Sequence, residues 1–219
     1  MDKTQIKETI ARRAARELPD GAFVNLGIGI PTLCVKYIPE DVHVVLQSEN
    51  GIVDTGVVVP GTEDPLHITD AGGAPAAVNI GGAFIDSAMS FALIRGGHVD
   101  ACILGGLEVD EQGNLANWSV PGKKMTGMGG AMDLLAGVRR VIVAMEHTAG
   151  GVPKIRKTCT LPLTGRSCVH RVITEMAVID VTPEGLMLME YHPDYTVEEI
   201  RAATEADLAI SPTLKPMFE

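Results

Sequence analysis

The chain has 219 residues, and its 18 Lys and Arg against 28 Asp and Glu give a formal net charge of −10. This balance argues against nucleic acid or an anionic membrane surface as the main partner, because both would be repelled. Aromatic residues make up only 4% of the chain, so a base-stacking surface is not expected either. A chain of this length buries a sizeable core without disulfides or metals, and we expect one domain over residues 1–219.

The cysteines indicate an intracellular protein. Cys34, Cys102, Cys159 and Cys168 show no CxxC spacing and no accompanying cluster of histidines. Such a distribution is typical of reduced thiols rather than of a disulfide framework or a metal site. The N-terminal segment is charged and amphipathic, and no apolar run is long enough for a membrane span. We therefore expect a cytoplasmic protein without a metal; a mature mitochondrial matrix chain has the same features.

The N-terminal half predicts short strands that end in turns rich in glycine. A first helix carries Ile6, Ile10, Ala14 and Leu18 on one face and stops at residues 19–21. The elements expected next are a strand at 22–26, a short helix from Pro31 to before Pro39, a strand at 42–46 and, beyond a Gly- and Pro-rich stretch, a helix at 84–94.

The C-terminal half continues this alternation of strands and helices. We expect a strand at 99–104, a polar turn region at 108–117, a helix at 131–135, a strand at 140–145, a hairpin of 176–181 and 186–190, a capped helix at 196–206 and a strand at 208–210. Apolar strands that end in glycine-rich turns and lead into helices indicate an α/β fold with an open, mostly parallel sheet. Ligands bind outside the carboxyl ends of such strands. The segments to inspect are therefore 27–31, 48–51, 105–106 and 127–130.

The turn Gly27-Ile28-Gly29-Ile30-Pro31 invites comparison with the dinucleotide-binding fingerprint. That fingerprint needs a third glycine at position 32, where this chain has Thr32, so a nicotinamide site is disfavoured. Two interpretations remain open: a turn kept small for packing, or a loop that brings bare backbone N–H groups to a ligand.

The segment Ser48-Glu49-Asn50-Gly51 is the most informative one. Glu49 directly follows a buried strand, and Asn-Gly allows a turn with positive φ that holds the preceding side chain forward. Such a glutamate is either a solvated strand end or a general base, nucleophile or metal ligand. The metal option is weak, because no second ligand lies at a suitable spacing.

A second glycine-rich segment, 127–130, precedes a short helix. Free N–H groups there would stabilise a developing oxyanion, although a loop kept small for packing has the same sequence pattern. The six histidines are scattered, and no arrangement of Ser, His and Asp or of Cys and His follows from their spacing. We treat them as structural; His147, which follows a strand, is the one that could approach a site.

Together these segments resemble the B (beta) subunit of the family I CoA-transferases of the 3-oxoacid type. The matching stretches span nearly the whole chain: VNLGIGIPT (24–32), LQSENG (46–51), SFALIRGGHVDACILGGLEVDEQGNLANW (90–118), PGKKMTGMGGAMDL (121–134), VAMEHT (143–148) and TLPLTG (160–165). The run at 86–111 looks most like acetate– or butyrate–acetoacetate CoA-transferases. The resemblance implies an open, mostly parallel sheet sandwiched by helices.

The resemblance also implies roles for single residues. Glu49 falls on the nucleophile of the family and would form a glutamyl-CoA thioester in ping-pong fashion. The N–H groups around Gly129 and Gly130 would bind the oxyanion and thioester. CoA and substrate would lie beside Asn25, Gly27, Gly29, Asn50 and Gly51. No metal or bound cofactor is implied, since coenzyme A is a substrate carrier, and the partner would be the A (alpha) subunit, in a heterodimer or heterotetramer.

The chain departs from the family pattern at two places. Residues 52–58 replace a Gly-rich, Pro-containing loop that many relatives carry after SENG. Gly73 stands where succinyl-using relatives commonly carry a lysine. The resemblance therefore favours a short-chain acyl-CoA and a 3-oxoacid such as acetoacetate as substrates. Succinyl-CoA:3-oxoacid or 3-oxoadipate transfer is the alternative.

Overall fold

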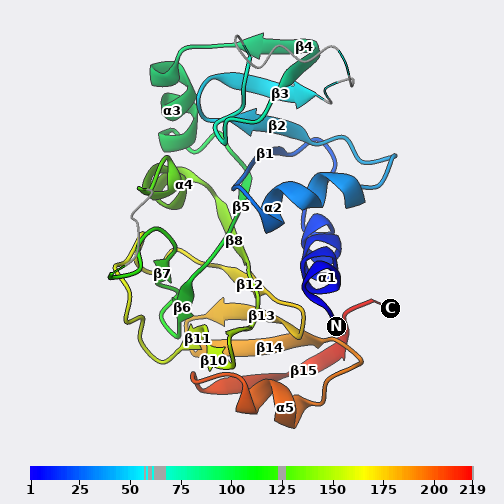
Figure 1. Cartoon of the computed structure of the whole chain (residues 1–219), viewed down its shortest axis with the longest axis vertical. Helices are drawn as coiled ribbons and strands as arrows, with labels where there is room; N and C mark the ends of the chain where they lie inside the picture. The colour runs from blue at the N-terminus through cyan, green and yellow to red at the C-terminus, as the bar shows by residue number, and fades with distance from the viewer. Residues whose placement is uncertain (57, 59–60, 62–67, 123–126, 219) are drawn as a thin grey trace.

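The computed structural model describes residues 1–56, 58, 61, 68–122 and 127–218, and its main feature is an open ten-stranded sheet (Figure 1). In spatial order the strands are β15 (Leu208–Pro216), β14 (Gly185–Tyr191), β13 (Ala177–Thr182), β12 (Arg171–Ile173), β8 (Arg140–Ala144), β5 (Ala101–Leu104), β1 (Phe23–Leu26), β2 (Val45–Ser48), β3 (Ile52–Gly56) and β4 (Ala77–Phe84). The five strands from β12 to β2 are parallel to one another. This confirms the open parallel sheet, to which β3, β4 and β13 add antiparallel pairs.

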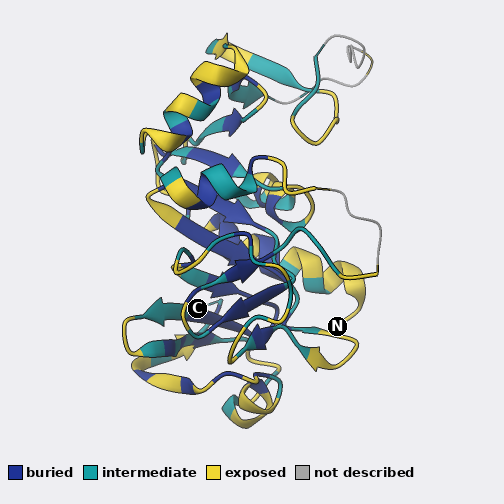
Figure 2. Ribbon diagram, turned by 90° about the vertical axis from the view of Figure 1, so that its left-hand side faces the viewer, coloured by how far each residue is buried: buried dark blue, intermediate teal, exposed yellow. Residues whose placement is uncertain are grey.

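Helices cover both faces of the sheet (Figures 1 and 2). One face carries α1 (Lys3–Ala15), α2 (Ile30–Leu33) and the 3-10 helix η1 (Cys34–Tyr37); the other carries α3 (Ser87–Arg95), α4 (Ala131–Gly137) and α5 (Val197–Ala202). Strand β5 shows why the strands are apolar throughout. Cys102 and Leu104 join the core under α3 and α4, whereas Ala101 and Ile103 join the core under α1. Alternate side chains of the strand are thus buried on opposite faces.

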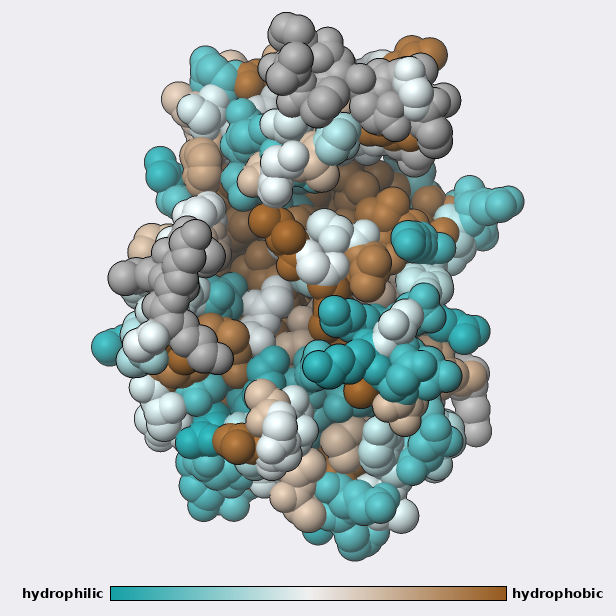
Figure 3. Space-filling model, viewed as in Figure 1, coloured by the Kyte–Doolittle hydropathy of each residue, from teal (hydrophilic) through white to brown (hydrophobic). Residues whose placement is uncertain are grey.

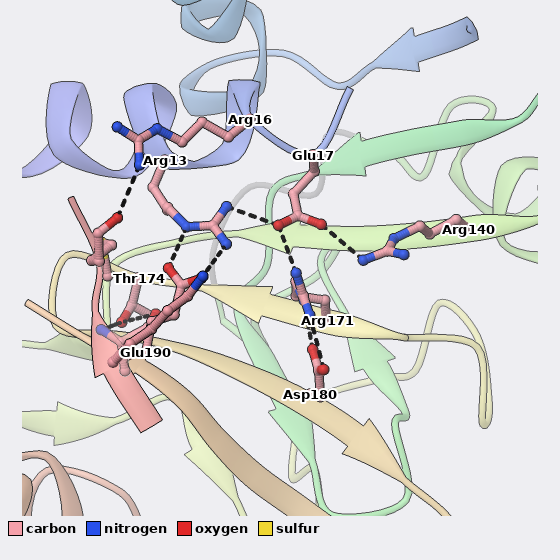
Figure 4. Close-up of polar contacts among 11 residues, drawn as sticks. Arg13, Arg16, Glu17, Arg140, Arg171, Thr174, Asp180 and Glu190 are labelled. Carbon is pink, nitrogen blue, oxygen red and sulfur yellow. Dashed lines mark hydrogen bonds and ion pairs between the residues drawn. The ribbon is translucent and has the colours of Figure 1, made fainter. Parts of the chain in front are cut away.

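A network of ion pairs around the buried Glu17 fastens the first helix to the sheet (Figure 4). The Glu17 carboxylate contacts the guanidinium groups of Arg13, Arg140 and Arg171 at 2.8, 2.8 and 2.6 Å. Arg13 also donates to Glu190 on β14. Burial would raise the pKa of Glu17, but the charge of Arg171 and the hydrogen bonds from Arg13 outweigh it, so the pKa lies below its ordinary value.

The last described residues close against the same helix. Arg16 donates to the carbonyl oxygen of Met217, which is buried in the core under α1. The guanidinium groups of Arg12 and Arg16 lie 5.3 and 5.4 Å from the ring centroid of Phe218. The two ends of the described chain therefore meet on one face of the sheet.

The helix expected at 84–94 begins later than its apolar spacing suggests. Phe84 belongs to β4, and Asp86 is the N-cap, accepting a hydrogen bond from the amide of Met89. The prediction was wrong at this end because a strand residue happened to continue the helical spacing. A cap residue, rather than the first apolar residue, sets the start of the helix.

The prediction of a polar turn at 108–117 is wrong. Strands β6 (Glu108–Asp110) and β7 (Leu115–Ala116) pair with each other, and β11 (Ile155–Arg156) completes a three-stranded sheet. Both acidic side chains of β6 are buried. Glu108 accepts from the amides of Thr160 and Leu161, and Asp110 accepts from the amide of Cys159. These donors come from a distant loop, so local sequence did not reveal that the carboxylates are satisfied inside.

Several boundaries also shift. The strand expected at 42–46 is β2, which runs from Val45 to Ser48. It extends beyond the expected end because the side chains of Gln47 and Ser48 have buried hydrogen-bond partners. Helix α5 has the predicted capping box of Thr196 and Glu199 but ends at 202 rather than 206. The amide of Glu205 bonds to Ile155 on β11 instead of continuing the helix. The closing strand, β15, is longer than expected. Small paired strands β9 (Thr148–Ala149) and β10 (Val152–Pro153) were not predicted.

Candidate functional site

Glu49 lies where the parallel strand β2 ends, and it is half-buried. Its carboxylate is held by Asn25, whose amide nitrogen donates to Glu49 Oε2 at 3.2 Å and to the backbone oxygen of Gln47 at 3.3 Å. Asn25 lies on the neighbouring strand β1, is 1% exposed, and stands opposite Gln47 in the parallel register. The predicted proximity of these two segments is therefore observed, and Asn25 fixes one carboxylate oxygen.

Gly130 lies against the other oxygen. A Cβ on Gly130 would lie 3.1 Å from Glu49 Cγ, 3.3 Å from Oε1 and 3.3 Å from a ring carbon of Phe91. Any side chain at this position would push on the carboxylate. Phe91 on α3 was not predicted as part of the site, because its helical spacing indicates only core packing.

The amide groups before α4 are available for a ligand. Among the described residues, none accepts a hydrogen bond from the N–H of Gly129 or Gly130, whereas the next N–H, of Ala131, bonds to Met128. Gly129 has a φ of +53°, a backbone conformation that favours glycine. Free donors beside a carboxylate suit a site at which negative charge develops.

The turn after Glu49 is fixed from several sides. Gly51 has a φ of +129°, and a Cβ there would collide with the carbonyl oxygen of Ile85. Its own carbonyl accepts from the amide of Ile85 at 2.9 Å. Asn50 donates to the carbonyl of Thr69 at 2.8 Å. The positive φ thus falls on Gly51, not on Glu49, and Asn50 and Gly51 position the turn rather than contact the carboxylate.

A second turn, residues 69–75, packs beside this one. The amide of Ala71 donates to Ser48 Oγ at 2.8 Å. Asp70 Oδ1 accepts from the amides of Gly72 and Ala74, which shapes the turn. A Cβ on Gly72 would lie 3.2 Å from the side chain of Ile28, in the loop after β1. The position of this turn was not predicted, since its contacts with Ser48 and Ile28 are long-range.

The loop after β1 brings its two glycines into different surroundings. Gly27 donates its amide to Ile103 at 2.8 Å, and a Cβ there would lie 3.2 Å from the side chain of Leu104. Gly29 has a φ of +98° and faces open space, beside the exposed Ile28. Close packing explains Gly27, and an open backbone explains Gly29. On the face of the molecule that Figure 3 shows, apolar side chains line a hollow in the middle.

His147 is not part of this site. It is fully buried, and its Nδ1 and Nε2 lie 2.9 Å from the hydroxyls of Thr174 and Thr204. Burial, helped by the charge of Lys154, lowers the pKa of His147 to about 4. The imidazole is therefore neutral at physiological pH and serves the packing of this region.

All four cysteines are free thiols. Within the described ranges, no group of three or more His, Cys, Asp or Glu side chains is arranged to hold a metal ion. None of the described helices is long and apolar enough to span a bilayer.

The chain that carries this glutamate beside free glycine amides matches a known family over most of its length. Residues 7–203 match the model of the family described as "Coenzyme A transferase". The chain belongs to this family.

Two curated relatives cover almost the whole chain. It is 53% identical over 212 residues to the beta subunit of the acetate CoA-transferase of Haemophilus influenzae, with 96% of this chain and 95% of the relative aligned. It is 50% identical over 209 residues to the corresponding subunit of a probable succinyl-CoA:3-ketoacid coenzyme A transferase of Bacillus subtilis, with 94% and 96% aligned. Both relatives are named as one subunit of a larger transferase, which implies a second subunit as partner.

A solved structure supports the fold. An acyl-CoA transferase from Escherichia coli O157:H7 is 26% identical as the apoenzyme, with a TM-score of 0.76 over 96% of this chain. Its thioester complex with CoA gives 25% identity and a TM-score of 0.73. In both, this chain spans only 42% of the other chain's length.

Proposed function

We propose that this chain is the catalytic beta subunit of a CoA-transferase that moves CoA between a short-chain acyl-CoA and a 3-oxoacid such as acetoacetate. The reaction passes through a glutamyl-CoA thioester on Glu49. The observation that carries this proposal is the position of Glu49 between the Asn25 amide and Gly130 at the carboxyl end of β2. The relative that was solved as a thioester complex with CoA supports an intermediate of this kind.

The chemistry divides one difficult transfer into easier steps. The Glu49 carboxylate attacks the thioester carbonyl, which forms a mixed acyl anhydride and releases the CoA thiolate. The thiolate then attacks the carbonyl of Glu49, which leaves the glutamyl-CoA thioester and frees the first acid as its carboxylate. The second acid runs the same steps in reverse. Water must be kept out, because both intermediates would hydrolyse.

The neighbouring residues have separate tasks in this scheme. Asn25 fixes one oxygen of Glu49 and leaves the other to attack. The free amides of Gly129 and Gly130 stabilise the oxyanion that forms at each addition step. Asn50 and Gly51 hold the turn, and Gly29, with its open backbone, leaves room for the CoA arm next to β1, where Gly27 packs against Leu104.

The covalent intermediate gives the most direct test. The complex incubated with acyl-CoA and no acceptor acid should accumulate CoA on this chain. Borohydride reduces a thioester but not a carboxylate, so it should inactivate only the CoA-loaded enzyme. Peptide mass analysis should locate the adduct, or the reduced residue, within LQSENG (46–51). An adduct on any other peptide would overturn the assignment of Glu49.

We expect the chain by itself to have little or no transferase activity. It supplies the nucleophile and some donors, but with a net charge of −10 it does not provide a complete groove for an anionic CoA arm. The partner is the alpha subunit, in a heterodimer or heterotetramer. Activity assays of this chain, of the alpha subunit and of their mixture check the prediction. Full turnover by this chain alone would contradict it.

We expect acetoacetate paired with acetate or butyrate to be preferred over succinate. Gly73 offers no cation to a second substrate carboxylate, and a missing partner for a buried carboxylate costs ~10²-fold or more in discrimination. Comparison of kcat/KM for acetyl-, butyryl- and succinyl-CoA measures the preference. The succinyl-CoA:3-oxoacid and 3-oxoadipate reactions remain the alternative, and the name of the Bacillus subtilis relative favours the first of them.

Variants at Gly73 separate charge from backbone strain. Gly73 is exposed, has a φ of +80°, and lies in the turn that binds Ser48 Oγ. Gly73→Lys should raise kcat/KM for succinyl-CoA relative to butyryl-CoA. Gly73→Met has the same backbone strain without the charge, so it should leave the ratio unchanged. A preference for succinyl-CoA in the unaltered complex would show that the second carboxylate is bound elsewhere.

A further inference from the structure

The aromatic ring of Phe91 lies beside the carboxylate of Glu49. Phe91 belongs to α3 and is half-buried. A Cβ on Gly130 would lie 3.3 Å from Phe91 Cε1 and 3.3 Å from Glu49 Oε1. Because both atoms lie at this distance from one point, the ring edge is no more than twice as far from the oxygen. An apolar edge therefore stands next to the carboxylate oxygen that Asn25 leaves free.

Helix α3 is fastened to strand β2 directly next to this ring. Ser90, which precedes Phe91, is fully buried, and its hydroxyl and carbonyl oxygens accept hydrogen bonds from Gln47 Nε2 at 2.9 and 3.3 Å. Gln47 stands two residues before Glu49, so the strand that presents the carboxylate also holds the helix that presents the ring. Gln47 Oε1 is buried without a hydrogen-bond partner among the described residues, a cost that an apolar side chain would avoid. The amide thus serves position rather than stability.

A cation stacks on the same ring and ties it to the next helix. The Arg95 guanidinium, one turn further along α3, lies 5.5 Å from the centroid of the Phe91 ring. It also pairs with Asp133 of α4 at 2.7 Å, and α4 begins directly after Gly130. The ring is therefore held from the strand on one side and from the neighbouring helix on the other.

The acyl group of the mixed anhydride forms at this place. In the proposed mechanism the free oxygen of Glu49 bonds to the carbonyl carbon of the thioester, so the acyl chain begins one bond from this oxygen. Three bonds of an extended chain span about 3.8 Å, which is the length of a butyryl chain beyond its carbonyl carbon. A hexanoyl chain, with two further bonds, extends roughly 6 Å. That length is comparable to the largest possible separation of ring edge and oxygen, so the longer chain meets the ring.

The donor and the acceptor acid pass the same wall. In ping-pong transfer the second acid enters through the anhydride with Glu49 by which the first acid left, in reverse order. A side chain that faces the acyl chain of the donor therefore faces that of the acceptor as well.

Resting on the proposed function, we propose that Phe91 limits the length of the acyl chain, in the donor and the acceptor acid alike. Its ring edge contacts the chain of the anhydride beyond the carbonyl carbon. Two- and four-carbon acyl groups fit beside the ring, and longer unbranched chains are disfavoured. Phe91 is then a specificity residue for the acid, and Gln47 and Arg95 position it.

The test measures kcat/KM of the assembled complex of the alpha and beta chains for acetyl-, butyryl- and hexanoyl-CoA, with acetoacetate as acceptor. Phe91→Ala should raise the ratio of hexanoyl- to acetyl-CoA by about 10- to 200-fold, the range for the fit of a methylene group in an apolar pocket. Phe91→Trp should lower the ratio of butyryl- to acetyl-CoA by about tenfold, because the larger ring takes up the space of the chain. Phe91→Leu should act in the same direction as Phe91→Ala, and it replaces that variant if the latter does not fold.

The acceptor side is measured separately. The CoA-loaded complex, freed of the first acid, is offered acetate or hexanoate. Phe91→Ala should raise the rate with hexanoate relative to acetate by a factor similar to that for the donor. A shift for the donor alone would overturn the shared wall.

Phe218 provides the matched control. It is also a half-buried phenylalanine, with the guanidinium groups of Arg12 and Arg16 at 5.3 and 5.4 Å from its ring centroid. It packs against the core under α1, on the opposite face of the sheet from Phe91. Phe218→Ala should therefore leave all of these ratios unchanged.

The outcomes separate this inference from the proposed function. Unchanged ratios in a folded Phe91→Ala complex, or equal losses with all three thioesters, would mean that the ring serves packing alone. Each result overturns the inference while the transferase activity stands. A complex that transfers CoA between no pair of acids would instead refute the proposed function.

Discussion

Glu49→Ala should abolish turnover, by on the order of 10⁴-fold or more, because no other group can form the covalent intermediate. The fold should survive, since Glu49 is half-buried at a strand end and makes a single side-chain hydrogen bond, to Asn25, within the described residues. The measurements are the steady-state rate with saturating substrates and the thermal midpoint of the complex. Near-normal turnover in this variant would refute the mechanism.

The shorter Glu49→Asp should also fail badly. One methylene withdraws the carboxylate by more than about 1 Å from Asn25 and Gly130, and misplacement of this size costs ~10²-fold in a positioned reaction. Glu184→Ala is the matched control, because Glu184 is an exposed glutamate in the turn between β13 and β14. Unchanged activity there shows that the losses come from position 49.

Glu17→Ala should destabilise the protein more than any change at the site, by about 3–5 kcal/mol. It would leave Arg13, Arg140 and Arg171 facing one another without the shared carboxylate, which is only 6% exposed. Urea unfolding should show the loss as a midpoint lowered by about 1–2 M. Glu8→Ala, on the exposed side of the same helix, should change the midpoint little.

The contribution of Glu17 should depend on pH with a definite sign. Its pKa in the folded protein lies below the ordinary value of 4.5, so its stabilisation is fully present above that value. It is lost as the pH falls through the folded pKa. The difference in unfolding free energy between the unaltered protein and Glu17→Gln should therefore be constant near neutral pH and shrink below pH ~4. A difference that grows in acid would contradict this account.

Much of the site could be predicted because strand order places it. Glu49 follows from an apolar strand that ends in a turn with glycine, and the segment of Gly130 from a glycine-rich start of a helix, whereas Asn25 was implied only by the resemblance to the family. The features that the sequence did not predict are held in place by residues distant in the sequence. The turn at 69–75 depends on Ser48 Oγ, and the carboxylate of Glu108 on amides more than fifty residues away. Neither leaves a periodic pattern in the sequence.

The element boundaries failed for a related reason. Polar residues such as Gln47 and Ser48 indicate the end of a strand, yet their buried partners continue it. Phe84 fits the first turn of a helix, yet it pairs with Ile52 in the sheet. In each case a tertiary contact outweighed the local preference, which spans only ~1 kcal/mol.

The closure of the chain's two ends on one face has a consequence for biosynthesis. Parallel partners at the centre of the sheet are far apart in the sequence, as Leu26 beside Ile103 illustrates, and such pairings form slowly. Helix α1 leaves the ribosome long before its buried neighbour Met217 is translated. The part of this core that Met217 completes therefore stays open until all the intervening residues have been added. During that interval the exposed apolar surface is open to aggregation, as in other chains whose core is completed late.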